Sequence, residues 1–531
     1  MRDRPELLAR GALGAAVLAP MAIWILADGR LARPTEVAGW ALLVALWAAC
    51  CPPRFLRPVA WVQLLALPLT AGWTGSVALT GAGPSVASTA SISAGAMREV
   101  FTAAKMAFHV PTVLVVLALT LALSVFAVRA TGVQGGRWRP ALACVFLGCT
   151  LGLGATMAST YPTIAQLASA EARVSVPWLS HLAVAKEEAD FALERLAMTP
   201  TKEVPPRQAA AAPRLFDMAP GLAVFVVGES LRADALIQPQ RGPWSRALAD
   251  RLGKGLGVRL PDACSGSNAT FISVPRLLAA VDPADYDGAA RKPTLLALAR
   301  AAGAVTAYIN NQEVWVVPEL GHDFMLKTAS LERNPYDEAV VAALGDYLAR
   351  TRSPRQAVLL HLYGEHAEYQ DRYPADMFGP EPAGLDAGAL SELRYQRAAE
   401  NGARVLVEAA ALLDKTDQPA YLVFTSDHGE NLPSDRTGKL MHAGQWVGKF
   451  DTTVPALVLW NRAFAASGRA ERLRPLVQAP GLLAHRDVAR AWLALAGMPD
   501  TLAPTAEPRT FGQMQDRPSA SPVVACAQLA P

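Results

Sequence analysis

Residues 222–227 read Leu-Ala-Val-Phe-Val-Val and run directly into Gly228-Glu229-Ser230-Leu231-Arg232-Ala233. A short run of consecutive apolar residues is typical of a strand that is buried on both faces of a sheet. In open sheets that are covered by helices, ligands bind beyond the carboxyl ends of the strands. The sequence therefore places Glu229 at a candidate functional position.

Four further runs of the same character follow in the chain, and helical stretches lie between them. Apolar strands that alternate with helices predict an α/β domain whose sheet is covered on both faces. The helical stretches include Pro293–Ala302 and Leu393–Leu413. The further strands are expected at Ala304–Ile309, Ala357–Leu362, Tyr421–Thr425 and Val454–Leu459.

Composition sets the N-terminal part of the chain apart from this domain. Of the 531 residues, 52% are hydrophobic and only 18% are charged, which is too apolar for an ordinary soluble protein of this length. The long uncharged runs are concentrated in residues 1–158. The net charge of +3 indicates no particular partner, and we expect no binding to nucleic acid.

The apolar runs of residues 1–158 predict a transmembrane domain of about five spans, because a bilayer-spanning helix needs roughly 20 mostly apolar residues. The first run follows three arginines, as in a signal peptide, but four more runs follow and no clear cleavage site does, so we favour a retained anchor. The second run is short and is also compatible with a re-entrant segment. The runs are Gly11–Ala27, Val37–Cys51, Val59–Thr80, Phe108–Val128 and Pro140–Ala158.

The distribution of positive charge predicts how these spans are oriented. With the N-terminus in the cytoplasm, eight Arg or Lys residues flank the spans on the cytoplasmic side and four on the other side, as the positive-inside rule requires. Five spans then place everything after Ala158 outside the cytoplasm. We expect an amphipathic linker helix and a Pro/Ala linker over 159–214, the α/β domain over 215–505, and an irregular tail over 506–531.

Acidic and imidazole side chains follow two other expected strands. One strand runs into Ser426-Asp427-His428-Gly429-Glu430, and another into His361-Leu-Tyr-Gly-Glu-His366. Two carboxylates and an imidazole from separate strand ends can converge on one divalent cation, and these groups are suitable ligands for zinc. Asp427 and His428 could instead cap a loop or a helix, but their place directly after an apolar strand favours metal binding.

A third polar stretch, Cys264-Ser-Gly-Ser-Asn-Ala-Thr270, leads into an apolar helix that begins Phe-Ile-Ser-Val-Pro. Helix N-termini bind phosphate through their free N–H groups and the helix dipole. A hydroxyl that is held there against a metal becomes a nucleophile at neutral pH. Composition alone favours Thr270 as a helix N-cap over a nucleophile, and Ser265, Ser267 and Ser273 compete with it.

In order and in approximate spacing over about 240 residues, these stretches resemble the motifs of the phosphoethanolamine transferases of the alkaline-phosphatase/sulfatase superfamily. The family includes enzymes that modify lipid A. The matching stretches are Val227-Gly-Glu-Ser-Leu-Arg-Ala233, Thr270-Phe-Ile-Ser-Val-Pro275, Leu360-His-Leu-Tyr-Gly-Glu-His366 with Arg372-Tyr373, Ser426-Asp-His-Gly-Glu430 with His442, and Val454-Pro-Ala456.

The resemblance implies an N-terminal α-helical transmembrane bundle joined to an α/β catalytic domain of the sulfatase and alkaline-phosphatase type. Thr270 corresponds to the family's nucleophile. Glu229, Asp427 and His428 correspond to the ligands of a zinc ion that also contacts Thr270.

Four further positions correspond to residues around the substrate in that family. His366 and His442 match histidines near the phosphoryl donor, where they would also help to hold a second metal. Asn310 and Asn311 stand where the family has asparagines near the substrate. The structural alternative for each histidine is a hydrogen-bonded loop residue without a catalytic role.

The resemblance also implies a reaction and its location. Phosphoethanolamine would pass from phosphatidylethanolamine to lipid A or to the lipopolysaccharide core through a phosphorylated threonine. The protein would be a multi-pass protein of the bacterial inner membrane with its catalytic domain in the periplasm. Phosphoglycerol transfer and phosphodiester hydrolysis remain alternatives, because the same metal and threonine would serve them. A non-catalytic membrane protein with a degenerate domain is an alternative of another class.

Two departures from the family pattern concern cysteines and the sulfatase signature. Many members carry a cysteine pair around the nucleophile, where this chain has Gly266 and Arg276. The C/S-x-P-x-R signature of a sulfatase is absent, because no residue separates proline and arginine in Ser273-Val-Pro-Arg276. Cys264 and Cys526 are the two cysteines outside the membrane region, and both a disulfide and two separate thiols are open for them.

Overall fold

The structure, a computed structural model, describes parts of the N-terminal region and most of the C-terminal domain. The chain divides into one unit of Met1–Met198 with Met514–Ala520 and a second unit of Thr199–Gln513 with Ser521–Pro531. The described residues are 4–19, 58, 60, 61, 63–65, 110–130, 216–240, 242–285, 292–312, 321–328, 336–435, 441–442, 447–498, 502–510 and 523–529.

In the first unit the structure gives bounds for α1 at Arg4–Leu18 and α8 at Val110–Ala130. Helix α8 covers most of the span that is expected at Phe108–Val128, and α1 overlaps the start of the first expected span. The other expected spans, apart from a few residues at 58–65, and the linker at 159–214 lie outside the described residues. Among the described residues, no helix combines the length and the apolar character that a membrane crossing needs. The five-span anchor stays a prediction.

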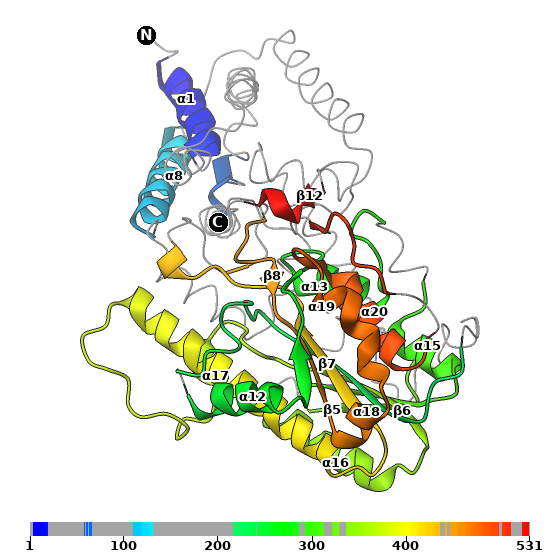
Figure 1. The fold of residues 1–531 in the computed structure, drawn as a ribbon. Helices are drawn as coiled ribbons and strands as arrows, with labels where there is room; N and C mark the ends of the chain where they lie inside the picture. The colour runs from blue at the N-terminus through cyan, green and yellow to red at the C-terminus, as the bar shows by residue number, and fades with distance from the viewer. Residues whose placement is uncertain are drawn as a thin grey trace. The chain divides into compact units, whose positions relative to one another are not determined.

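The second unit is built on a seven-stranded sheet with the order β2-β9-β7-β1-β6-β4-β5, of which Figure 1 labels β5, β6 and β7. Strands β7, β1, β6, β4 and β5 are parallel, whereas β9 runs antiparallel to both of its neighbours, β7 and β2. The strands are β1 Gly221–Gly228, β2 Gly257–Arg259, β4 Val305–Asn310, β5 Phe324–Lys327, β6 Arg355–His361, β7 Ala420–Ser426 and β9 Ala456–Trp460.

Four of the expected strands are confirmed as β1, β4, β6 and β7. The fifth is wrong as a single strand, because the run Val454–Leu459 splits at Pro455 into β8 (Thr453–Val454) and β9. Proline has no N–H for a ladder hydrogen bond and is poorly tolerated inside a sheet. Strand β8 instead joins a three-stranded sheet with β3 (Ala263–Cys264) and β10 (Leu483–Ala484). The short strands β2 and β5 are not predicted by the apolar pattern.

The main sheet separates two hydrophobic layers, as its apolar strands predict. Alternate residues of β1 point to opposite faces, so Phe225 and Val227 belong to one core and Val224 and Val226 to the other. Helices α13, α15 and α20 pack on the first face, and α12, α16 and α17 on the second (Figure 1). The helices are α12 Pro243–Gly253, α13 Thr270–Leu278, α15 Leu295–Ala301, α16 Glu338–Arg350, α17 Ala387–Asp414 and α20 His485–Leu495.

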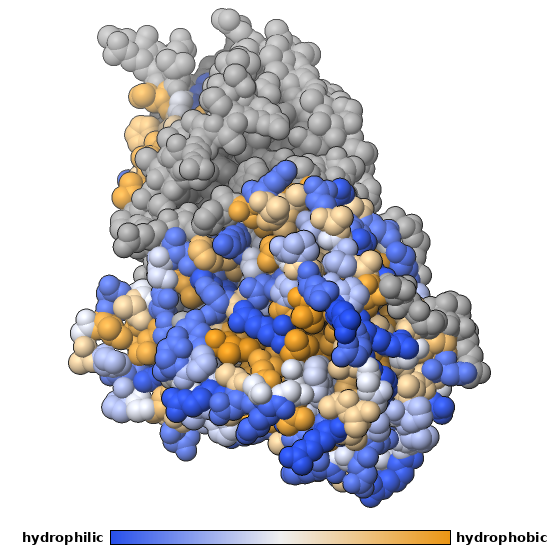
Figure 2. All heavy atoms as spheres, in the orientation of Figure 1, coloured by the Kyte–Doolittle hydropathy of each residue, from blue (hydrophilic) through white to orange (hydrophobic). Residues whose placement is uncertain are grey.

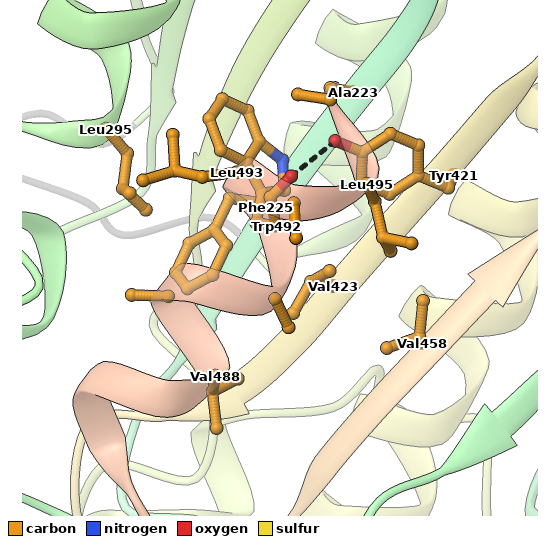
Figure 3. Packing of buried hydrophobic residues seen from close by; sticks show 14 of the residues in the cluster. Ala223, Phe225, Leu295, Tyr421, Val423, Val458, Val488, Trp492, Leu493 and Leu495 are labelled. Carbon is orange, nitrogen blue, oxygen red and sulfur yellow. Dashed lines mark hydrogen bonds between the residues drawn. The ribbon is translucent and has the colours of Figure 1, made fainter. Parts of the chain in front are cut away.

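Helix α20 is held on one face of the sheet by contacts of Trp492 with β1 and β7. Trp492 lies edge-on against Phe225 of β1, with ring centroids 6.4 Å apart (Figure 3). The Tyr421 hydroxyl of β7 donates a hydrogen bond to the Trp492 carbonyl at 2.7 Å, which satisfies polar groups inside the core. As a result His485, the first residue of α20, lies 2.9 Å from the Ser426 carbonyl at the carboxyl end of β7.

The surface of this unit reflects the internal placement of its apolar residues. Hydrophilic residues cover most of the face that is visible in Figure 2, with smaller apolar areas between them. Strand β5 differs, because Phe324, Met325 and Leu326 on this edge of the sheet are partly exposed. Such a distribution is expected of a domain that buries its large apolar residues in two layers.

A disulfide joins the C-terminal tail to the segment that leads to Thr270. Cys264 on β3 is bonded to Cys526, with the Cα atoms 6.4 Å apart, so the structure favours the bridge over two separate thiols. The tail is also more ordered than expected, because β11 (Arg509–Thr510) pairs antiparallel with β12 (Val524–Ala525). The bridge spans 262 residues of sequence and ties the tail to the site described next.

Candidate active site

Strands β1 and β7 bring two acidic residues together at the carboxyl edge of the sheet. Gly228 at the end of β1 pairs with Ser426 at the end of β7, so Glu229 and Asp427 follow neighbouring strands. The Asp427 amide donates to the Gly228 carbonyl at 3.1 Å. Both carboxylates are fully buried. A functional role explains this burial better than a contribution to solubility, which requires exposed carboxylates.

Ser230 turns the chain sharply after Glu229. Its φ is 58°, in the left-handed region that residues other than glycine seldom adopt, at a cost of about 1–3 kcal/mol. The turn directs the Ser230 amide to Asp427 Oδ1 at 3.1 Å, while its hydroxyl donates to Glu229 Oε1 at 3.0 Å. The Tyr395 hydroxyl donates to the Ser230 carbonyl at 2.8 Å and holds the turn.

Thr270 is the first residue of α13 and lies against both a carboxylate and an imidazole. Its Oγ1 is 3.2 and 3.1 Å from the two carboxylate oxygens of Glu229 and 3.1 Å from Nε2 of His428. One turn further along α13, the Ser273 hydroxyl donates to the Asp427 carbonyl at 2.6 Å and docks the helix on the end of β7. The hydroxyl of Ser265, which the sequence offers as an alternative nucleophile, donates to the Ser267 backbone carbonyl.

Glu229, Asp427 and His428 present unshared electron pairs to one another. His428 Nδ1 lies 2.9 Å from the Gly429 carbonyl, which can only accept, so Nε2 is the unprotonated nitrogen of the neutral ring. That Nε2 is 3.3 Å from both Glu229 Oε1 and Asp427 Oδ2. Among the described residues, buried Asp427 Oδ2 has no hydrogen-bond partner. Carboxylate and imidazole ligand atoms that lie within 4.8 Å of one another are a donor set that fits zinc.

Burial and mutual charge set the protonation of these groups in the metal-free protein. Burial raises the pKa of Asp427, and the charge of Glu229 raises it further, to about 7. Burial acts to lower the pKa of His428, but the charge of Asp427 and the contacts with Glu229 raise it to about 10. Burial acts to raise the pKa of Glu229, yet the charge and hydrogen bond of His428 hold it well below its usual range. A proton on His428 therefore stands in for a cation, and a metal must displace it.

His366 and His442 lie beside this donor set. Together with Glu229 they form a second group whose ligand atoms lie within 4.8 Å of one another. The buried carboxylate of Glu430 accepts from Nδ1 of His442 at 3.2 Å, which orients that ring. The His442 ring centroid is 4.1 Å from that of His428 and 5.8 Å from that of His366.

The two asparagines that are expected near the substrate both form hydrogen bonds within the protein. Asn310 Oδ1 accepts from the backbone amide of Gln312 at 2.7 Å. Asn311 Nδ2 donates to buried Asp337 Oδ1 at 2.8 Å. These contacts hold the loop after β4, and the expected place of both asparagines near the substrate stays a prediction.

Four polar residues around the site have no role in the sequence analysis. Ser230 and Glu430 stand inside the quoted motifs, so their closeness to the expected metal ligands is a signal that could have found them. Gln312 contacts Glu229, and His485 contacts the Ser426 carbonyl at the end of β7. Neither residue stands in a motif. Only the pairing of distant strands and helices brings these two to the site.

We predict that Asp427→Ala abolishes tight zinc binding. The zinc affinity should fall by more than about a hundredfold, because even the loss of an outer-shell partner costs about 10–100-fold. The affinity is measured on metal-free protein by competition with a fluorescent chelator. The matched control is Asp487→Ala, which removes a buried aspartate that accepts from the Ala484 amide at the start of α20 and should keep wild-type affinity. Stoichiometric zinc in folded Asp427→Ala would refute this donor set.

The same assay has an expected pH dependence. With the pKa of His428 raised to about 10, zinc binding releases a proton below that pH, so the affinity falls about tenfold for each unit by which the pH is lowered. Below pH 7 the raised pKa of Asp427, about 7, adds a second proton and a steeper fall. An affinity that stays constant between about pH 6 and 9 would contradict this assignment.

Comparison with known proteins finds a family and several relatives of this chain. Residues 222–498, more than half of the chain, match the family model described as Sulfatase. Phosphoethanolamine transferase EptA of Helicobacter pylori is 28% identical over 136 residues, 24% of each chain. Phosphoethanolamine transferase CptA of Salmonella typhimurium is 24% identical over 234 residues, 40% of each chain. The matched segments thus span well under half of the length of these relatives.

Two solved structures share the fold. Integral membrane protein lipooligosaccharide phosphoethanolamine transferase A (EptA) from Neisseria meningitidis has a TM-score of 0.60 over 99% of each chain, at 16% identity. The C-terminal periplasmic domain of EptC from Escherichia coli has a TM-score of 0.50 and 18% identity, covering 60% of this chain and 97% of its own. At these identities the likeness concerns the fold alone. The chain belongs to the sulfatase family, and the curated proteins that it resembles are phosphoethanolamine transferases.

Proposed function

We propose that this protein is a zinc-dependent transferase that moves phosphoethanolamine from phosphatidylethanolamine to a glycolipid of the cell envelope, either lipid A or the lipopolysaccharide core. The observation that carries the proposal is the position of Thr270 Oγ1, within 3.2 Å of Glu229 and His428. A hydroxyl beside a metal donor set is suited to attack phosphorus. The names of the relatives, phosphoethanolamine transferases, suggest the group that is transferred.

The proposed reaction fits a multi-pass protein of the bacterial inner membrane with its catalytic domain in the periplasm. The apolar runs of residues 1–158 support an anchor of about five spans, and a protein of the same fold is described as an integral membrane protein. The disulfide between Cys264 and Cys526 supports an oxidising compartment. Donor and acceptor are both membrane lipids, so an anchored site meets them at a raised effective concentration.

In the first half-reaction, Thr270 loses its proton to solvent and its Oγ1 attacks the phosphorus of phosphatidylethanolamine. A bond forms between Oγ1 and phosphorus, and the bond from phosphorus to the diacylglycerol oxygen breaks. A histidine beside the site, His366 or His442, protonates the departing oxygen, so diacylglycerol leaves as a neutral alcohol. Zinc, when bound, would polarise the threonine oxygen and offset the charge on the phosphoryl oxygens.

In the second half-reaction, an oxygen of the acceptor attacks the phosphorus that is held on Thr270. Where the acceptor is a hydroxyl, the histidine takes its proton; the bond from phosphorus to Oγ1 breaks, and Oγ1 takes up a proton from solvent to regenerate the threonine. Buried Glu430 accepts a hydrogen bond from Nδ1 of His442 at 3.2 Å and fixes the orientation of that ring. His442 is therefore well placed to alternate between acid and base.

We predict that Thr270 carries the covalent intermediate. Incubation with phosphatidylethanolamine in the absence of acceptor, followed by peptide mass spectrometry, should find phosphoethanolamine on Thr270. Thr270→Ala should lose the adduct and lower the transfer rate by at least about a thousandfold. The matched control is Thr294→Ala, which removes a threonine that caps α15 and should keep both. An adduct on Ser265, Ser267 or Ser273 would show that the nucleophile is misassigned.

Donor and acceptor are tested with two further measurements. In a host without such enzymes, the wild-type protein should add phosphoethanolamine to lipid A or to the core, whereas Thr270→Ala should add none. The addition is detected by mass spectrometry of the separated lipid A and core fragments. In vitro, phosphatidylethanolamine should serve as the donor in preference to phosphatidylglycerol. The opposite preference would favour phosphoglycerol transfer, and hydrolysis without transfer would favour a phosphodiesterase. If neither fragment gains the group from zinc-loaded protein, the glycolipid acceptor is wrong.

A further inference from the structure

We propose that Gln312 is a positioning residue that fixes the Glu229 carboxylate for metal binding, a role that rests on the zinc site proposed above. Gln312 lies two residues beyond the end of β4 and is only 4% exposed. Strand β6 separates β4 from β1, so Gln312 reaches Glu229 from across a neighbouring strand. It stands outside every motif of the sequence analysis.

The Gln312 side chain uses both hydrogens of its amide nitrogen. Nε2 donates to Glu229 Oε2 at 2.9 Å and to the Leu362 carbonyl, just past β6, at 3.0 Å. A flipped amide would set its oxygen against two other oxygens, so the network determines the orientation of the group. The Leu362 carbonyl thus anchors the amide, and the second hydrogen points at Glu229.

The backbone at Gln312 is held as firmly as its side chain. Asn310 Oδ1 accepts from the Gln312 amide at 2.7 Å, which closes a tight turn after β4. The backbone amide of Asn311 donates to the His361 carbonyl at 2.9 Å, which ties the same turn to β6. The two asparagines therefore fix the position from which Gln312 contacts Glu229.

Gln312 and Ser230 bind opposite oxygens of Glu229. The Ser230 hydroxyl donates to Oε1 at 3.0 Å, and Gln312 Nε2 donates to Oε2 at 2.9 Å. The last torsion of a glutamate side chain is soft, so a carboxylate without such contacts samples many orientations. Two donors on opposite oxygens stop this rotation. The carboxylate is then oriented before a metal arrives.

The same contacts leave room for the metal and the nucleophile. A carboxylate offers about four acceptor positions, two on each oxygen. Ser230 and Gln312 use one on each oxygen, and the free positions remain for a cation and for Thr270 Oγ1, which is 3.2 and 3.1 Å from the two oxygens. Gln312 is neutral, so it orients the carboxylate without competing with a cation for its charge.

The test compares zinc affinities of full-length, metal-free variants by chelator competition. Gln312→Met removes both donors at nearly constant side-chain length and should lower zinc affinity about 10–100-fold, the usual loss for an outer-shell partner. The matched control is Gln356→Met, at the amino end of β6, where a glutamine that is also 4% exposed donates to the Ser353 carbonyl at 3.1 Å. This control should lose comparable thermal stability and keep wild-type zinc affinity.

Wild-type zinc affinity in Gln312→Met would overturn the proposal. If Gln312→Met fails to fold while Gln356→Met folds, Gln312→Asn is measured instead, because it keeps the amide but is one methylene too short to reach Glu229. A weakened affinity in Gln312→Asn supports the proposal, and a wild-type affinity overturns it. The assay needs no lipid, so a lack of phosphoethanolamine transfer alongside weakened zinc binding would refute only the proposed reaction. A wild-type protein that binds no zinc would refute both.

Discussion

The candidate site depends on one electrostatic constraint, the burial of two carboxylates and an imidazole whose ligand atoms lie within 4.8 Å of one another. Buried charges of like sign are costly unless a cation or a proton accompanies them. In the metal-free protein a proton on His428 meets this requirement, and the pKa of that ring is raised to about 10 as a result. A divalent cation meets the same requirement with more charge, and Asp427 Oδ2, which faces His428 Nε2 at 3.3 Å, gives it a further ligand.

The fold holds these groups in place from several separate elements. The parallel pair β1 and β7 supplies Glu229 and Asp427, and α13 brings Thr270 and docks through Ser273. The loop after β4 brings Gln312 across the intervening strand β6. Because the two hydrophobic layers fix all of these elements relative to the sheet, packing far from the site determines distances within it. The site is therefore oriented by the fold before any ligand binds.

Local sequence patterns predict part of this arrangement. The apolar run before Gly228 predicts β1 and thereby places Glu229 at a strand end. The division of the run Val454–Leu459 into two strands could also have been predicted, because Pro455 lies inside it. The contact between Gln312 and Glu229 could not be predicted, because it joins residues 83 positions apart and depends on the strand order. The register of neighbouring strands is a long-range property that apolar periodicity does not encode.

The most direct test of this account is to locate the metal in crystals of the zinc-loaded protein. Diffraction data collected on both sides of the zinc absorption edge should show a strong anomalous peak between Glu229, Thr270, Asp427 and His428. Zinc–oxygen and zinc–nitrogen distances of about 2.0–2.2 Å are expected for this donor set. A zinc-loaded crystal with no anomalous peak among these four residues would contradict the central claim that their convergence forms a metal site.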